Sequence, residues 1–122
     1  MIIDCIQKRI DSIEAIYLFR SLARGSENAE SDYDIVVFVS KSPKNDAEAI
    51  FNVRYPLIGK LKRPMDLIII DVEDLAHPSV ILYNIYKDRR LLFGRDVLEN
   101  YERIVSRMKP VVANCATVGY YV

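Results

Sequence analysis

A pair of aspartates, Asp32 and Asp34, lies at the start of the apolar segment Tyr33–Val39 and constrains this chain more than any other feature. The segment is rich in Ile, Val and Phe, which predicts a central β-strand. Side chains two residues apart on a strand lie on the same face, so both carboxylates are expected to point the same way. Two carboxylates in such proximity repel each other unless a cation lies between them, and hard oxygen ligands suit magnesium.

A third aspartate, Asp66, lies in a second apolar segment, Met65–Ile70, which also predicts a strand. If this strand lies beside the first one, three carboxylates converge and can hold two magnesium ions around an in-line phosphoryl displacement. An Asp-x-Asp pair taken alone is a weak signal. Asp32 can instead cap a turn, and Asp34 can be solvated at a strand edge.

Ten residues separate Ser21 from Asp32, and Ser21 follows the apolar segment Ala15–Phe19 closely. This segment predicts a buried strand, and a short helix is expected to begin at Ser21 and end at Gly25. A helix N-terminus presents free backbone N–H groups to phosphate, and the Ser21 hydroxyl adds one more donor. A phosphate-binding turn and the carboxylates are therefore expected to face one pocket.

The rest of the chain alternates between amphipathic stretches typical of helices and apolar runs typical of strands. Four helices are expected. The first is amphipathic and carries Ile2 to Ile13, and the second, over about 46–62, is interrupted by Pro56. The others cover 80–86 and 96–108, the last closed by Pro110, and Leu91–Phe93 is expected to be extended and to end at Gly94. The apolar tail 111–122 has no clear period. This alternation predicts an α/β (α+β) fold with a small mixed sheet and flanking helices.

Length and composition favour a single cytoplasmic domain over residues 1–122, with a core of about 14–96 followed by the last helix and the tail. Lys plus Arg is 17 and Asp plus Glu is 17, so the net charge of +0 carries no strong nucleic-acid signal. No apolar run reaches the roughly 18 residues of a membrane helix, and no basic n-region opens the chain. Cys5 and Cys115 lack a CxxC spacing and are expected to be free thiols.

The segment Tyr17–Val39 resembles the signature of the minimal nucleotidyltransferases of the DNA polymerase beta superfamily. That signature reads Leu-Phe-Gly-Ser-x-Ala-Arg-Gly, a polar loop, and then Ser-Asp-x-Asp before hydrophobic residues. Here the two parts are Leu-Phe-Arg-Ser-Leu-Ala-Arg-Gly at 18–25 and Ser-Asp-Tyr-Asp-Ile at 31–35. Met-Asp-Leu-Ile at 65–68 resembles the strand of the third carboxylate, and the resemblance covers roughly 17–96.

This resemblance implies a nucleotidyltransferase fold and a role for each matching residue. Asp32 and Asp34 would bind the metals. Asp66 would help to bind the catalytic metal and would deprotonate the attacking hydroxyl. Ser21 would hold the triphosphate, and Arg24 would either contact the nucleotide or pin the loop through a salt bridge.

Arg20 departs from the signature, because it stands where the family has glycine. Glycine there lets the backbone approach the triphosphate with no side chain in the way. Two outcomes are open: Arg20 blocks the phosphate-binding turn, or it turns outward and adds charge-assisted hydrogen bonds to phosphate. Since Ser21 and the three aspartates are retained, we expect an active site with Arg20 on the nucleotide.

Small members of the family that this chain resembles are often antitoxins that add AMP to a tyrosine of a HEPN-domain ribonuclease. The resemblance therefore implies ATP as substrate, two Mg²⁺ ions, a HEPN toxin as partner and a hetero-oligomer with it. Two other functions stay open. One is a binding module that neutralises its partner by contact alone, with the tail 111–122 either docking the partner or completing the core. The other is a stand-alone transferase acting on a small-molecule hydroxyl.

Overall fold

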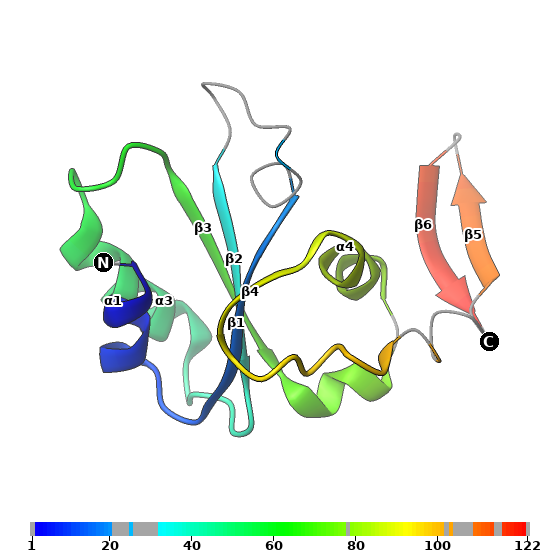
Figure 1. Cartoon of the computed structure of the whole chain (residues 1–122), viewed down its shortest axis with the longest axis horizontal. Helices are drawn as coiled ribbons and strands as arrows, with labels where there is room; N and C mark the ends of the chain where they lie inside the picture. Colours follow the sequence, from blue (N-terminus) through cyan, green and yellow to red (C-terminus); the bar gives the residue numbers. More distant parts are fainter. Residues whose placement is uncertain are drawn as a thin grey trace.

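The protein is represented by a computed structural model that describes residues 2–20, 25, 32–77, 79–101, 103, 109–113 and 116–121. In chain order its elements are α1 (Ile2–Arg9), β1 (Ile13–Phe19), β2 (Tyr33–Val39), α3 (Asp46–Arg54), the 3₁₀ helix η1 (Tyr55–Leu57), β3 (Met65–Asp71), the 3₁₀ helix η2 (Val72–Ala76), α4 (Val80–Asp88), β4 (Arg90–Gly94), β5 (Lys109–Ala113) and β6 (Ala116–Tyr121). Helices and strands alternate as expected (Figure 1). No helix in these ranges is long and apolar enough to cross a membrane.

Four strands form a mixed sheet in the order β3-β2-β1-β4. The pairs β1–β2 and β1–β4 are antiparallel, whereas β2 and β3 are parallel. Parallel neighbours need a crossover connection, and the chain makes it through α3. The prediction that the strand of Asp66 lies beside the strand of Asp34 is therefore confirmed.

Both faces of the sheet are covered, which is why its central strands are apolar on both sides. On one face Ile35, Val37 and Val39 of β2 pack in a cluster with residues of α1 and α3. On the other face Val36 and Phe38 pack with residues of α4 and of the segment 97–101. Figure 1 shows α1 and α3 on one side of the sheet and α4 on the other.

The first helix is shorter than its isoleucine spacing predicts. It ends at Arg9, and Ile13 is the first residue of β1 and not part of the helix. Ser12 has a φ of +60°, which is incompatible with a continuing right-handed helix. Ile10 is buried in the same cluster as the helix, so the periodic spacing reflects shared burial and extends past the end of the helix. Cys5 in α1 is a free thiol, as expected, and Cys115 lies outside the described residues.

The interruption expected at Pro56 is present. The helix α3 begins after Asn45, whose side chain accepts a hydrogen bond from the Glu48 backbone N–H at 3.1 Å. It ends at Arg54, and Pro56 lies in the first turn of η1. Because proline has no N–H to donate, the chain continues there as a short 3₁₀ helix.

The C-terminal segment differs from the sequence-based expectation. A helix was expected over 96–108, closed by Pro110, and Pro110 does lie outside any helix, in β5 opposite Tyr120. Residues 97–100 form a turn where a helix was expected, with a hydrogen bond from Tyr101 N to Leu98 O at 3.0 Å, whereas Tyr101 and Arg103 are helical as expected. Residues 102 and 104–108 lie outside the described residues.

The tail forms a sheet of its own. Strands β5 and β6 pair antiparallel and are not part of the four-stranded sheet. The strand β6 contacts α4, and Figure 1 shows the pair on the side of α4 that faces away from the main sheet. Within the described residues the tail therefore adds no strand to the four-stranded sheet, and its two expected roles, docking a partner or completing the core, stay predictions.

Candidate active site

The parallel pairing of β2 and β3 places Asp34 directly beside Asp66. Asp34 alternates with the buried Ile35 and therefore shares a face with Val36, which packs on the α4 side. Asp66 is its in-register partner and lies on the same face. Asp34 is only 6% exposed, whereas Asp66 is exposed. A buried and an accessible carboxylate thus lie side by side at the edge where both strands begin.

Asp32 completes the acidic set, immediately before β2 and partly buried. The pKa of Asp34 reports on its surroundings, because it is raised from its usual value. Burial is the main cause, the Arg20 guanidinium opposes it, and the negative charges of Asp66 and Asp32 raise the pKa further. All three carboxylates therefore share one electrostatic environment.

Arg20 makes a contact that neither expected outcome included. Its Nη1 donates to the Asp34 Oδ1 at 3.4 Å, and its guanidinium carbon lies 5.3 Å from the centre of the Phe19 ring. The contact follows from the strand register, because Phe19 at the end of β1 pairs with Asp34. The φ of Arg20 is +60°, a left-handed backbone that favours glycine, which is the residue that the resembled signature has at this position.

The donor chemistry of this edge fits a hard divalent cation. Carboxylate oxygens are the ligands that Mg²⁺ prefers, and the like charges around the buried Asp34 are an arrangement that a cation stabilises. In the described ranges, no three Asp, Glu, His or Cys side chains are close enough to hold a metal ion together. The cationic group in contact with Asp34 here is the Arg20 guanidinium.

Two of the expected site residues, Ser21 and Arg24, lie outside the described residues, and so does the loop 26–31. Their roles stay predictions. Gly25, which was expected to end the short helix, has a φ of +73°. This left-handed conformation is typical of a glycine that follows a helix.

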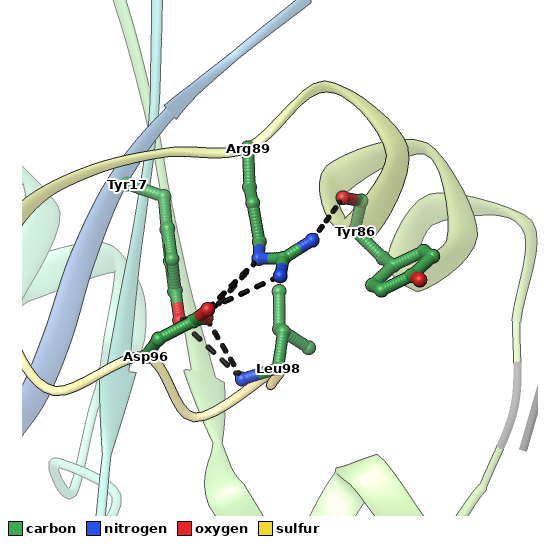
Figure 2. A network of polar contacts seen from close by, with 5 residues as sticks. All are labelled: Tyr17, Tyr86, Arg89, Asp96 and Leu98. Atoms are coloured by element: carbon green, nitrogen blue, oxygen red, sulfur yellow. Dashed lines mark hydrogen bonds and ion pairs between the residues drawn. The ribbon is translucent and has the colours of Figure 1, made fainter. Parts of the chain in front are cut away.

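Figure 2 shows a polar network around Tyr17 that sequence reasoning missed. Tyr17 packs with Val36 and therefore lies on the same face of the sheet as Asp34. The Tyr17 hydroxyl donates to the Asp96 Oδ1 at 2.6 Å, and the Leu98 N–H donates to the Tyr17 Oη at 3.4 Å. The Arg89 guanidinium donates from Nε and Nη2 to the Asp96 carboxylate, both at 3.1 Å, and from Nη1 to the Tyr86 carbonyl at 2.9 Å. The network joins β1 to the end of α4 and to the segment after β4.

The pKa values in this network follow from its hydrogen bonds. Burial and the hydrogen bond to Asp96 raise the pKa of the Tyr17 hydroxyl. Burial alone would raise the pKa of Asp96, but the hydrogen bonds from Arg89 and Tyr17 outweigh it and lower the pKa. Tyr17 and Asp96 are far apart in the sequence, so only the position of Tyr17 in an apolar strand hinted at a buried hydroxyl that needs a partner.

A separate cleft of about 840 Å³ lies between α3 and β3. It is lined by Met65 and Leu67, which alternate with Asp66 and belong to the cluster on the α1 and α3 face. The sheet therefore separates this cleft from the carboxylates. Three basic residues, Arg54, Lys62 and Arg63, and three exposed apolar ones, Phe51, Tyr55 and Ile58, contribute to its lining.

Comparisons with known proteins identify the family of this chain. Residues 1–98 match the family model described as polymerase beta, nucleotidyltransferase, a range that contains the three aspartates. The chain is also 30% identical over 118 residues to a protein of Methanocaldococcus jannaschii named as a candidate protein adenylyltransferase, covering 88% of this chain and 80% of that protein.

Two solved structures resemble the fold. One is a chain of a toxin–antitoxin crystal structure with AMP-PNP, with a TM-score of 0.60 and 23% identity over 86% of this chain and 87% of that one. The other is a chain from tri-AMPylated Shewanella oneidensis HEPN toxin in complex with MNT antitoxin, with a TM-score of 0.53 and 22% identity over 86% and 84%. At these identities the likeness shows a shared fold.

Proposed function

Since the chain belongs to the polymerase beta nucleotidyltransferase family, we propose that it transfers AMP from ATP to a tyrosine of a HEPN toxin and thereby acts as its antitoxin. The observation that supports the proposal is the in-register pairing of Asp34 with Asp66, with Asp32 just before β2, because these are the aspartates to which the family resemblance gives a role in nucleotidyl transfer. The adenylyltransferase name of the archaeal relative favours AMP as the transferred group. The toxin–antitoxin neighbours favour a toxin as the acceptor.

In this proposal the acidic residues have two roles, metal binding and proton acceptance. Asp32, Asp34 and Asp66 would hold two Mg²⁺ ions, which supply positive charge to the triphosphate. The accessible Asp66 accepts the proton of the tyrosine hydroxyl. The phenolic oxygen forms a bond to the α-phosphorus as the bond between this phosphorus and the bridging oxygen breaks, and pyrophosphate leaves. Ser21, Arg20 and Arg24 would bind the phosphates.

A second function, neutralisation of the partner by contact alone, is favoured by the cleft beside α3. Phe51, Tyr55 and Ile58 are 59%, 65% and 72% exposed, which is unusual for large apolar side chains gathered at one place. The lining contains basic residues and no acidic ones. This combination suits an apolar partner segment with acidic residues at its edge. A partner segment in the cleft would lie on the face of the sheet opposite the carboxylates, so this second function needs neither the carboxylates nor a nucleotide.

The test is a transfer assay with ATP labelled at the α-phosphate and magnesium. The acceptor is the product of the gene next to the one that encodes this chain, which is the expected toxin. We expect label on the toxin, none with Asp32→Asn/Asp34→Asn, and full labelling with Asp74→Asn, which changes an exposed carboxylate in η2. Label only from Arg20→Gly would mean that Arg20 silences the site. No label from the native chain or from Arg20→Gly, with the toxin still bound, would leave neutralisation by contact.

A further inference from the structure

We propose that Arg20 is a resident counter-ion of Asp34 that competes with divalent cations until the phosphates of a nucleotide draw it away. The metal and the nucleotide would then bind cooperatively, and the metal alone would bind weakly. The inference rests on the proposed function, because it assumes that Asp34 is a metal ligand.

The competition follows from the contact itself. The Arg20 Nη1 lies 3.4 Å from the Asp34 Oδ1, and the Asp34 side chain is only 8% exposed. A cation on this carboxylate would therefore lie close to a positive guanidinium, and the two like charges repel each other, with part of the repulsion screened by water around the half-exposed Arg20. Arg20 must leave Asp34, or the metal must bind against its charge.

Arg20 has the freedom to leave. Its side chain is 53% exposed, and its described contacts are the single 3.4 Å hydrogen bond and the ring of Phe19. A triphosphate offers more negative charge than one carboxylate, and guanidinium binds phosphate oxygens in pairs. Arg20 also directly precedes Ser21, where the sequence predicts the phosphate-binding turn. The arginine thus stands between two anionic partners, of which the nucleotide is the stronger.

Thermodynamic linkage makes this exchange reciprocal. If nucleotide binding removes Arg20 from Asp34 and so raises the affinity for metal, bound metal raises the affinity for nucleotide by the same factor. Glycine at this position provides no such counter-ion, because it has no side chain. Arginine in place of glycine at position 20 would therefore couple metal binding to nucleotide binding, and the two would depend less on each other with glycine there.

The test measures binding and needs no turnover. Mn²⁺ affinity is measured by electron paramagnetic resonance on the full chain without nucleotide, and α,β-methylene-ATP affinity is measured calorimetrically in EDTA. We expect Arg20→Gln to bind Mn²⁺ about three- to tenfold tighter and the nucleotide several-fold more weakly, as loss of one half-exposed ion pair predicts. Arg20→Lys, which keeps the charge, should stay near the native Mn²⁺ affinity.

Arg95→Gln is the matched control, because Arg95 donates to Glu14 at 3.1 Å in an exposed ion pair away from the carboxylates. It should change neither affinity. Unchanged or weaker Mn²⁺ binding by Arg20→Gln, with binding still lost in Asp34→Asn, would overturn the counter-ion role and leave the proposed function standing. Absence of Mn²⁺ binding from native protein and Arg20→Gln alike would overturn the metal site itself, and this inference with it.

Discussion

Asp34 and Asp66 are direct partners in the parallel pairing of β2 and β3, one carboxylate buried and the other exposed. The crossover through α3 brings them together from distant parts of the chain. In the proposed mechanism, this difference in exposure would give the two carboxylates different roles, because the buried one is held in place and the exposed one is accessible to an acceptor.

Asp66→Asn tests the task of the accessible carboxylate. We expect transfer to the toxin to fall at least about 100-fold, as loss of a general base predicts, with the melting temperature almost unchanged because Asp66 is exposed. Initial rates of labelling and thermal denaturation measure the two effects. Asp74→Asn serves as the control. Native-like rates for Asp66→Asn would remove this residue from the mechanism.

Asp34→Asn tests how far the buried carboxylate lowers the stability of the metal-free protein. Because the pKa of Asp34 is raised in the folded state, mainly by burial, the group contributes most to stability below its ordinary pKa. That contribution is lost as the pH rises through the raised pKa. In EDTA at pH 7, Asp34→Asn should therefore melt about 2–4 °C above the native chain, and the difference should shrink toward pH 4. A lower melting temperature at pH 7 would show that the ion pair with Arg20 outweighs the cost of burial.

Tyr17→Phe removes the hydroxyl at the centre of the Asp96 network and retains the ring that packs edge-on against Phe38. We expect the free energy of unfolding to drop by about 1–2 kcal/mol, because Asp96 and the Leu98 N–H both lose a partner. Urea denaturation followed by circular dichroism measures it. Tyr55→Phe, at a 65% exposed position, should change little. Equal effects of the two substitutions would contradict a stabilising network.

Gly94→Ala tests the close approach of β4 to β1. Gly94 has a φ of +84°, and a Cβ there would overlap the backbone carbonyl oxygen of Glu14. Gly59 has a similar φ of +76° with open space around it, so Gly59→Ala measures the conformational cost alone. We expect a loss of about 1 kcal/mol for Gly59→Ala and at least about 2 kcal/mol for Gly94→Ala. Similar losses in denaturant titrations would mean that β4 moves aside freely.

Phe51→Ala/Tyr55→Ala tests the cleft as a docking surface. The two rings contact each other, with centroids 5.5 Å apart, and both are exposed. Truncated aromatic residues at the centre of an interface typically weaken binding by more than about tenfold, and we expect this for the toxin in calorimetry. Leu92→Ala, an exposed apolar residue on β4, is the control. Native affinity in the double variant would place the toxin elsewhere on the surface.

Several elements were predictable because their residues carry local signals. The apolar run Tyr33–Val39 coincides with β2, and the interruption at Pro56 follows from its missing N–H. The errors arose where a local pattern has two explanations. Ile13 continues a helical spacing but begins a strand, since burial on one side of the sheet satisfies both patterns. Residues 97–100 continue a stretch that is typical of a helix but form a turn, next to Asp96, which binds Tyr17 and Arg89.

The sequence by itself determined that Tyr33–Val39 and Met65–Ile70 are strands and that acidic residues lie at their starts, because these features depend on side-chain chemistry at short range. Only the tertiary structure decided that Asp66 lies beside Asp34, that Arg20 contacts Asp34, and that Tyr17 binds Asp96. These pairings depend on strand order, register and helix packing. Such long-range choices minimise the free energy of the whole chain and leave no local mark on any one segment.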